Sequence, residues 1–322
     1  MTTLVIGGAG YIGSHVTRLL ADRGQDVVVV DDLSTGFRSR LGEVPLVEID
    51  VTRTGAAEEL AGVMRERSVS AVIHFAAHKQ VGESVANPEM YWRDNIAGLA
   101  NVLDGAAQAG VRDIVFSSSA AVYGMPDVDL VQEDLTPEPI NPYGASKLVG
   151  EWMLKDAERA HGMRTVGLRY FNVAGAGWPE LADTLVMNLV PIVLDALDRG
   201  DRPKVFGDDY DTPDGTCIRD YVHVLDLAEA HIAALDYLKR DTREHRVFNV
   251  GTGTGSSVLD VINAIADATG TEIDPEIADR RPGDPAKLVC STDRIREELS
   301  WKSEHTLAEI VQSAVDARRQ RD

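Results

Sequence analysis

The chain has 322 residues, which is long enough to bury a large core without disulfides and, as a rough guide, to form about two domains. Its formal net charge of −20 repels phosphate backbones, so we expect no nucleic-acid partner. The two cysteines, Cys217 and Cys290, form no spacing motif, and we find neither a signal peptide nor an apolar run that could span a bilayer, so we expect a reducing compartment, the cytoplasm, and no membrane partner.

The N-terminal segment follows the order of a dinucleotide-binding unit. Residues 4–6 form a short apolar run that predicts a strand, and residues 7–13 form a Gly-rich turn. Apolar residues at helical spacing then predict a helix that ends near Gly24, and residues 27–30 predict a second strand, which Asp31 follows. Strand, glycine turn, helix, strand and acid, in this order, are typical of a unit that binds the pyrophosphate of a dinucleotide.

Each glycine of this turn has a physical role in such a unit. Gly7 permits the tight turn, Gly10 lets the backbone approach the pyrophosphate, and Gly13 lets the helix pack closely. The helix N-terminus then faces the phosphates. Asp31 follows at the interval where a carboxylate reaches the adenosine ribose hydroxyls, and Asp32 adds a second negative charge. A 2′-phosphate would be repelled there, so the sequence predicts NAD and not NADP as the cofactor.

Strands and helices continue to alternate as far as residue 168. Further strands are predicted at residues 46–50, 71–75, 114–116 and 165–168, and helices at 56–67, 88–109 and 142–161. This alternation predicts an α/β fold with a Rossmann-type, doubly wound parallel sheet. Ligands bind at the carboxyl ends of strands in such sheets, and the polar runs 117–119 and 169–172 fall at these ends.

After Asn172 the alternation breaks, which predicts a smaller α/β substrate-binding domain. We expect the cofactor domain to comprise residues 1–175 plus about 222–250, and the substrate domain about 176–221 plus 251–322. The glycine-rich run 251–255 is predicted to be a loop, because no second strand and acid follow it at the right interval. The other predicted elements are helices at 184–197 and 224–238, strands at 205–207, 217–218 and 247–250, an acidic loop at 208–214 and, from residue 256, a helix, a short strand, a loop with Arg280 and Arg281, and two terminal helices.

Three residues form a candidate catalytic group. Tyr143 and Lys147 are four positions apart, which places both on one face of a predicted helix. A free tyrosine has a pKa of about 10, and a nearby ammonium would lower it, so the pair is suited to proton transfer near pH 7. Ser119, at the end of a predicted strand, would hydrogen-bond the same substrate oxygen. Joined to a dinucleotide fold, this group predicts hydride transfer at a carbon that bears a hydroxyl.

The motifs reveal a family resemblance that runs nearly from end to end of the chain. The sequence resembles the extended short-chain dehydrogenases/reductases of the NAD-dependent epimerase/dehydratase type, and most closely their UDP-glucose 4-epimerase branch. The segments that carry the resemblance are residues 7–15, 72–77, 81–85, 116–124, 143–147, 169–172, 214–216, 219–224, 257–261 and 280–284.

The resemblance implies an isomerase that interconverts UDP-galactose and UDP-glucose with tightly held NAD. A hydride leaves C4 of the sugar for NAD while Tyr143 takes the proton of the 4-hydroxyl group; the 4-keto sugar then turns and receives the hydride on its other face. Arg219 and Arg281 are implied to hold the UDP diphosphate, since guanidinium groups suit phosphate oxygens. The resemblance also implies a homodimer in which the helices at 88–109 and 142–161 pair into a four-helix bundle.

The family's contacts transfer to this sequence position by position, as expectations. The catalytic residues are Ser119, Tyr143 and Lys147. The cofactor-binding residues are Gly7, Gly10, Tyr11, Ile12, Gly13, Asp31, Asp32, Leu33, Ser34, Thr35, Gly36, Asp50, Val51, Phe75, Ala76, Ala77, His78, Lys79, Asp94, Asn95, Ser117, Tyr143, Lys147, Tyr170 and Phe171. The substrate-binding residues are Lys79, Ser119, Ala120, Ala121, Tyr143, Asn172, Asn188, Leu189, Lys204, Val205, Phe206, Arg219, Tyr221, Val258, Arg281, Asp284 and Leu288.

Three positions depart from the family's usual pattern. The family often has Thr where Ala121 stands, which removes a hydroxyl near the sugar. It usually has Asn where Asp94 stands, which leaves one cofactor contact open. Leu288 occupies the position that gates the sugar pocket, where Tyr narrows the pocket and a small residue such as Cys admits an N-acetyl group. Leucine is intermediate, so the range of sugars stays open.

Several other functions share this fold. A 4,6-dehydratase or decarboxylase needs acidic residues directly after Ser119, where Ala120 and Ala121 stand, so this function is disfavoured. A 4-epimerase of a UDP-N-acetylhexosamine, a UDP-uronate or a UDP-pentose stays open. A non-catalytic NAD-binding regulator is a remote alternative, because such proteins lose the pair formed here by Tyr143 and Lys147. The eight histidines show no ligand spacing, so we expect no metal site.

Overall fold

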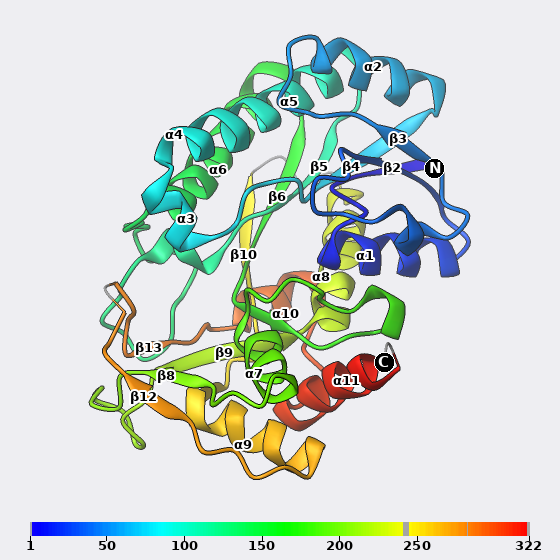
Figure 1. Cartoon of the computed structure of the whole chain (residues 1–322). Helices are drawn as coiled ribbons and strands as arrows, with labels where there is room; N and C mark the ends of the chain where they lie inside the picture. Colours follow the sequence, from blue (N-terminus) through cyan, green and yellow to red (C-terminus); the bar gives the residue numbers. More distant parts are fainter. Residues whose placement is uncertain (1, 241–244, 282, 321–322) are drawn as a thin grey trace.

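A seven-stranded parallel sheet forms the centre of the computed structural model, which describes residues 2–240, 245–281 and 283–320 (Figure 1). Pro282, part of the motif at 280–284, lies outside the described residues. The spatial order β10–β6–β5–β4–β1–β2–β3 reverses direction at β1, as in a Rossmann fold, so the predicted fold class is confirmed. The strands are β1 (Thr2–Ile6), β2 (Asp26–Asp31), β3 (Leu46–Glu48), β4 (Val69–His74), β5 (Asp113–Ser117), β6 (Arg164–Tyr170) and β10 (Arg246–Val250).

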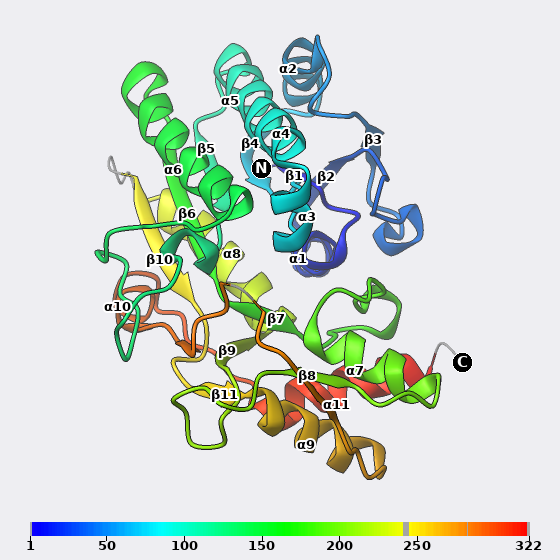
Figure 2. The same ribbon diagram turned by 60° about the vertical axis from the view of Figure 1, so that its left-hand side comes forward.

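Helices cover both faces of this sheet, because successive side chains of a strand point to opposite faces. On β1, Leu4 and Ile6 join the core under one set of helices, whereas Val5 joins the core under the other set. Figure 2 shows α2, α5 and α6 side by side on the first of these faces. The first set comprises α2 (Ala56–Glu66), α5 (Ala97–Ala109) and α6 (Pro142–His161), and the second comprises α1 (Tyr11–Asp22) and α8 (Val224–Leu238).

A smaller group of elements begins where β6 and β10 end, and it occupies the lower part of Figure 1. Its strands form a four-stranded sheet from β7 (Asn172–Ala174), β9 (Ile218–His223), β11 (Gly255–Ser257) and β13 (Lys287–Leu288), and a parallel pair from β8 (Lys204–Phe206) and β12 (Glu276–Ala278). Three helices enclose a separate apolar core with these strands: α7 (Leu189–Asp198), α9 (Val258–Thr269) and α11 (Leu307–Arg319). The exact division into domains stays a prediction.

Short helical elements connect the larger ones. They are η1 (Arg38–Leu41), α3 (Val81–Ala86), α4 (Pro88–Tyr91), η2 (Trp92–Ile96), η3 (Ala120–Tyr123), η4 (Pro179–Leu181) and α10 (Asp293–Leu299). Ile295 and Leu299 of α10 return to the core of the large sheet, although α10 follows the elements of the smaller group. None of the helices in the described part of the chain has the length and hydropathy that a membrane span requires.

Two predicted helices differ from the structure. The helix predicted at 184–197 is wrong at its start, because α7 begins only at Leu189. Asp183 accepts hydrogen bonds from the Leu185 N–H at 3.1 Å and from Asn188 Nδ2 at 2.7 Å, so a turn replaces the predicted first helical turns. The helix predicted at 88–109 is interrupted, since a wide π turn, η2, separates α4 from α5.

The remaining predicted elements are confirmed within a few residues, apart from one strand. The strand predicted at 217–218 is β9, which begins at Ile218 and continues to His223, so it is much longer than predicted and excludes Cys217. The glycine-rich run at 251–254 is a loop, as predicted, and its last glycine, Gly255, begins β11.

Candidate active site

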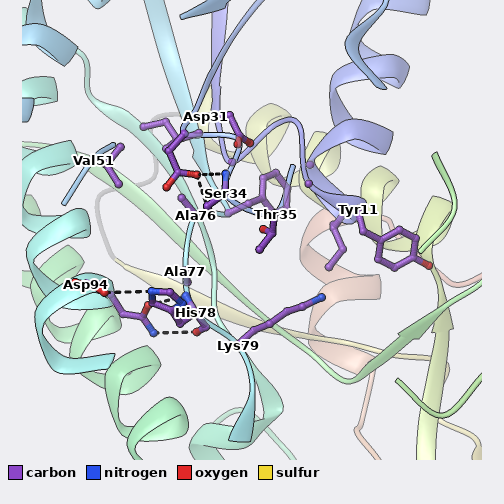
Figure 3. A pocket seen from close by; sticks show the side chains of 18 of the residues that line it. Tyr11, Asp31, Ser34, Thr35, Val51, Ala76, Ala77, His78, Lys79 and Asp94 are labelled. Carbon is purple, nitrogen blue, oxygen red and sulfur yellow. Dashed lines mark hydrogen bonds and ion pairs between the residues drawn. The ribbon is translucent and has the colours of Figure 1, made fainter. Parts of the chain in front are cut away.

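A cavity of about 280 Å³ lies at the carboxyl ends of β1, β2 and β4 (Figure 3). The predicted cofactor-binding residues line it, with the exception of Leu33, Gly36, Ser117 and Phe171. The Leu33 N–H donates to Asp31, and a Cβ atom on Gly36 would come close to the same carboxylate. Ser117 accepts a hydrogen bond from a lining lysine, and Phe171 is buried in a different apolar cluster.

The glycine turn after β1 is shaped by close contacts that only glycine allows. Gly7 has φ +78°, and a Cβ atom there would lie 2.7 Å from the backbone nitrogen of Ala76. A Cβ atom on Gly13 would lie 2.2 Å from the carbonyl oxygen of Gly7. A Cβ atom on Gly10 would meet only the Gly7 oxygen, at 3.3 Å, and Gly10 lines the cavity. A pyrophosphate can therefore approach the turn and the N-terminus of α1 without meeting a side chain at Gly10.

Asp31 is held in place at the end of β2 by backbone groups. Its Oδ2 accepts from the Ala9 N–H and its Oδ1 from the Leu33 N–H, each at 2.9 Å. Leu33 adopts φ +58°, and a Cβ atom on Gly36 would lie 2.9 Å from Asp31 Oδ1. Burial raises the pKa of Asp31 despite these two hydrogen bonds. The carboxylate is thus fixed at the cavity wall, where an adenosine ribose would lie next to it.

The loop that follows β4 is held by Asn95, which lies in the π turn η2. Asn95 Oδ1 accepts from the His78 N–H at 2.8 Å, and its Nδ2 donates to the His78 oxygen at 3.1 Å and to Ser146 Oγ at 3.0 Å. The neighbouring Asp94 is paired with Arg93 at 2.6 Å and lies 3.1 Å from His78 Nε2 (Figure 3). The interruption of the predicted helix therefore brings two successive side chains to one loop, a use of π turns that is common at functional sites.

Two of the three predicted catalytic residues, Tyr143 and Lys147, line the cavity, and the third, Ser119, lies next to Tyr143 outside the lining. Asn141 caps α6 by accepting from the Gly144 N–H at 2.9 Å, so Tyr143 lies in the first turn of the helix. Lys147 Nζ donates to the Ser117 oxygen at 2.8 Å and lies 6.0 Å from the centre of the Tyr143 ring. Ser119 lies close enough to Tyr143 for its hydroxyl group to lower the pKa of Tyr143, and Ser119 Oγ accepts from the Ala121 N–H at 3.2 Å.

The expected lowering of the tyrosine pKa by the lysine is not found. Burial raises the pKa of Tyr143, and the hydrogen bond from Ser119 opposes this only in part. Burial also lowers the pKa of Lys147 to about 7, so the lysine is not fully charged near neutral pH. The prediction took Lys147 as a charged ammonium and did not include burial, whereas both side chains are buried.

Apart from Lys79 and Tyr143, the predicted substrate residues lie outside this cavity, and seven of them lie on strands of the smaller sheets. Arg219 on β9 pairs in register with Leu288 on β13. An Arg219 guanidinium nitrogen also lies 3.4 Å from Asp284 Oδ1. These three residues, predicted from separate motifs, are therefore neighbours in space.

A second pair of predicted substrate residues lies at the end of β8. The Arg281 guanidinium group lies 3.7 Å from the centre of the Phe206 ring. Val205 is buried in the core of the smaller group, so only its backbone can face a ligand, and Lys204 is paired with Glu276 at 3.6 Å. The other predicted substrate residues are Tyr221 and Val258 in that same core, Asn172 in register with Tyr221, Asn188 bonded to Asp183, Leu189 at the start of α7, and Ala120 and Ala121 in η3 directly after Ser119.

The comparisons with known proteins agree with this site. Residues 3–251 match the sequence model of the "NAD dependent epimerase/dehydratase family". The chain belongs to this family. A "UDP-glucose 4-epimerase" of Azospirillum brasilense is 50% identical over 97% of this chain and 90% of its own length.

Two solved structures of the family resemble the protein over its whole length. A UDP-glucose 4-epimerase of Stenotrophomonas maltophila, with bound NAD and formylated UDP-arabinopyranose, has a TM-score of 0.94, 39% identity and coverage of 100% of this chain and 98% of that one. A UDP-Glc/GlcNAc 4-epimerase of Campylobacter jejuni has a TM-score of 0.86, 39% identity and coverage of 99% of both chains.

The cavity fits the cofactor on which this family depends. The open glycine turn at the start of α1 suits a pyrophosphate, and the fixed carboxylate of Asp31 suits a ribose with two free hydroxyl groups. Tyr170, at the end of β6, closes the cavity near Tyr143 and Lys147. Tyr11 lines the cavity too, but its ring points away from the other labelled side chains in Figure 3, and its hydroxyl donates to the Gly175 oxygen at 2.6 Å.

Several lining residues were missed at the level of sequence. Arg40 donates to the Ala182 oxygen at 2.9 Å and to Thr184 Oγ1 at 3.3 Å, which holds the turn at 183–188 against the cofactor side. No motif marks this region, so the sequence carried no signal for it. Glu83, in contrast, lies within the resembling segment 81–85 and could have been found. The missed lining residues are Ile6, Val30, Arg40, Ile49, Thr52, Gln80, Glu83, Asp183, Leu185 and Met187.

Proposed function

We propose that the protein is a UDP-glucose 4-epimerase, an isomerase that interconverts UDP-galactose and UDP-glucose through a 4-keto sugar. The observation that carries the proposal is that Tyr143 and Lys147 line a cavity that fits NAD, with Ser119 next to Tyr143. Such a group takes the proton of the hydroxyl group on the carbon from which the hydride departs. The relative from Azospirillum brasilense, which is 50% identical in sequence and is named a UDP-glucose 4-epimerase, supports the choice of UDP-glucose.

The chain's own residues perform the proton chemistry in this proposal. NAD, when bound, supplies a hydride acceptor and donor for C4 of the sugar. Tyr143 removes the proton of the 4-hydroxyl group and returns it after the sugar has turned. Ser119 stabilises the phenolate by hydrogen bonding, and Lys147, in its charged form, does so electrostatically.

The nucleotide part of the substrate is assigned to the smaller sheets. Arg219 and Arg281 are expected to hold the diphosphate, since guanidinium groups bind phosphate oxygens in pairs of hydrogen bonds. Arg219 lies beside the carboxylate of Asp284, and Arg281 lies on the face of Phe206. Both cations are thus already held near the place where the phosphates would bind.

The range of sugars is the finer part of the proposal. Leu288 pairs with Arg219 and packs against the cluster that contains Ala120, the residue after Ser119. Its side chain therefore lies between the nucleotide residues and the catalytic residues, where it would limit the group at C2 of the sugar. A UDP-N-acetylhexosamine is the second candidate substrate, because the relative from Campylobacter jejuni acts on both UDP-Glc and UDP-GlcNAc by name.

We further propose a cytoplasmic homodimer. Both cysteines are free and buried, which fits a reducing compartment. Trp152 of α6 is 56% exposed, and Val85 and Trp92, from α3 and η2, are 64% and 42% exposed. The elements that carry Val85 and Trp92, α3 and η2, both contact α6, so we infer that these apolar groups share the helical face that the predicted four-helix bundle would bury. The molar mass measured by light scattering tests this, and a mass near 34.9 kDa would contradict it.

The test of the function uses the purified full chain without added cofactor. Incubation with UDP-galactose should yield UDP-glucose, and acid treatment of the same protein should release NAD. Protein that contains NAD but leaves UDP-galactose unchanged would contradict the proposed substrate. In that case UDP-N-acetylgalactosamine is the next substrate to test, because of Leu288.

A further inference from the structure

We propose that Glu151 and Arg169, a buried ion pair behind the catalytic residues, position Ser119 relative to Tyr143. The proposal rests on the function proposed above, because it assigns a role within that site. Neither residue lines the cavity, and neither belongs to the predicted catalytic, cofactor or substrate residues. Their role would therefore be exerted through their hydrogen-bond partners.

The pair joins the catalytic helix to the sheet. Glu151 lies on α6 four residues after Lys147, on the same helix face, and Arg169 lies on β6. Arg169 Nε donates to Glu151 Oε1 at 2.8 Å, and Arg169 Nη2 donates to Glu151 Oε2 at 2.6 Å. Each side chain is only 5% exposed. Two parallel hydrogen bonds of this kind fix orientation as well as distance.

Glu151 also holds the segment that carries the catalytic serine. Ser118 Oγ donates to Glu151 Oε1 at 2.6 Å. Ser118 lies between Ser117, whose oxygen accepts from Lys147 Nζ, and Ser119, which lies next to Tyr143. The chain is therefore tied to α6 at the two residues directly before the catalytic serine, and the second of these ties depends on the Glu151 carboxylate.

Arg169 holds the same segment from its other side. Its Nη1 donates to the Tyr123 hydroxyl at 2.9 Å and to the Glu133 oxygen at 3.2 Å. Tyr123 ends η3, the turn that follows Ser119, and its hydroxyl in turn donates to Asn249 Oδ1 at 2.7 Å. The ion pair thus holds the chain by hydrogen bonds both before Ser119, at Ser118, and after it, at Tyr123.

The geometry leaves little room for displacement between the two catalytic segments. A Cβ atom on Gly144 would lie 2.3 Å from the Ala121 oxygen, so α6 and η3 are in direct contact next to Tyr143 and Ser119. Buried ion pairs add little net stability compared with apolar side chains of similar size. Because the pair contacts the chain on both sides of Ser119, we assign to it the placement of the serine hydroxyl next to the tyrosine.

The test compares Ser118→Ala, Glu151→Gln and their double variant with a matched control, Asp113→Asn. Asp113 pairs with Arg164 at 2.5 Å and joins β5 to β6 at their other ends. For each full-length variant we would measure kcat and KM for UDP-galactose, bound NAD and Tm. The wild-type rate is measured first, so a failure of the proposed function would be seen there and not confused with a failure of this inference.

We expect Ser118→Ala to lower kcat about tenfold, which is less than the roughly 100-fold loss that a misplacement of about 1 Å can cause. Its KM and bound NAD should stay unchanged. Glu151→Gln should lower kcat further. The double variant should be no slower than Glu151→Gln, because both substitutions act on the same hydrogen bond, between Ser118 and Glu151. Asp113→Asn should lower Tm while kcat stays at the wild-type value.

Two results would overturn the proposal. One is a wild-type kcat in Ser118→Ala, a mild change that decides the matter even if Glu151→Gln fails to fold. The other is a loss of kcat in Asp113→Asn that equals the loss in the site variants, since this would reduce the effect to a general loosening of the sheet.

Discussion

The Tyr143→Phe variant tests the proposed proton transfer most directly. The substitution removes one hydroxyl group and leaves the ring, which is 7% exposed and meets Tyr91 edge to face at 6.4 Å between ring centres. Loss of a general acid–base group lowers kcat by about 10²- to 10⁴-fold, which raises the barrier by about 3–5 kcal/mol. The lost hydrogen bond with Ser119 changes stability by only about 1 kcal/mol, partly offset because a buried hydroxyl no longer needs a partner.

The matched control is Tyr237→Phe. Tyr237 is also 7% exposed, and its hydroxyl donates to Glu298 at 2.9 Å, away from the cavity. We would measure conversion of UDP-galactose, NAD released by acid, and Tm for both variants. Tyr143→Phe should lose turnover but keep NAD and Tm, whereas Tyr237→Phe should keep turnover. A Tyr143→Phe enzyme that retains more than a tenth of the wild-type kcat would refute the assignment of Tyr143 as the base.

Three further variants test other parts of the site. Lys147→Met should raise Tm most below pH 7 and progressively less toward pH 10. A lysine whose pKa in the folded protein is about 7 destabilises the fold fully below that pH, and this effect fades with rising pH as the unfolded lysine also loses its proton. A difference in Tm between the variant and the wild type that does not change with pH would contradict the lowered pKa. Gly13→Ala should abolish NAD retention, because its Cβ atom would lie 2.2 Å from the Gly7 oxygen in the glycine turn. The control Gly62→Ala, in open space on α2, should keep NAD and stabilise the fold by up to about 1 kcal/mol. Equal NAD contents in the two variants would count against the close-contact argument. Asp31→Asn should lose NAD affinity by about tenfold or more, since a hydrogen bond to a charged group contributes about 1.5–3 kcal/mol, and its preference for NAD over NADP should narrow; unchanged discrimination in competition binding would show that Asp31 does not read the ribose.

The sequence could predict those features that depend on local pattern. The glycine turn, Asp31 and the spacing of Tyr143 and Lys147 each follow from short-range geometry, and the structure brings them to one cavity. The alternation of strands and helices likewise led to the correct sheet, because a parallel strand buried on both faces leaves a clear apolar run.

Features that depend on contacts between distant segments could not be predicted. Asp183 diverts the backbone at 183–188 through its own side-chain bonds, so an apolar pattern typical of a helix gives a turn. The role of Arg40 depends on Ala182, which lies far along the chain. The pKa of Tyr143 was predicted in the wrong direction because burial, which the spacing to Lys147 does not reveal, outweighs the effect of Ser119 that lowers this pKa.

The order in which the walls of the cavity leave the ribosome follows from the way they are divided along the chain. The glycine turn and Asp31 are made first, but Tyr143, Tyr170 and Met187 complete the cavity only much later, and β10 closes the sheet later still. Contacts between such distant segments also slow folding. A nascent chain that ends before Tyr143 would thus lack one wall of the cavity, and firm capture of the cofactor belongs among the later events of the protein's maturation.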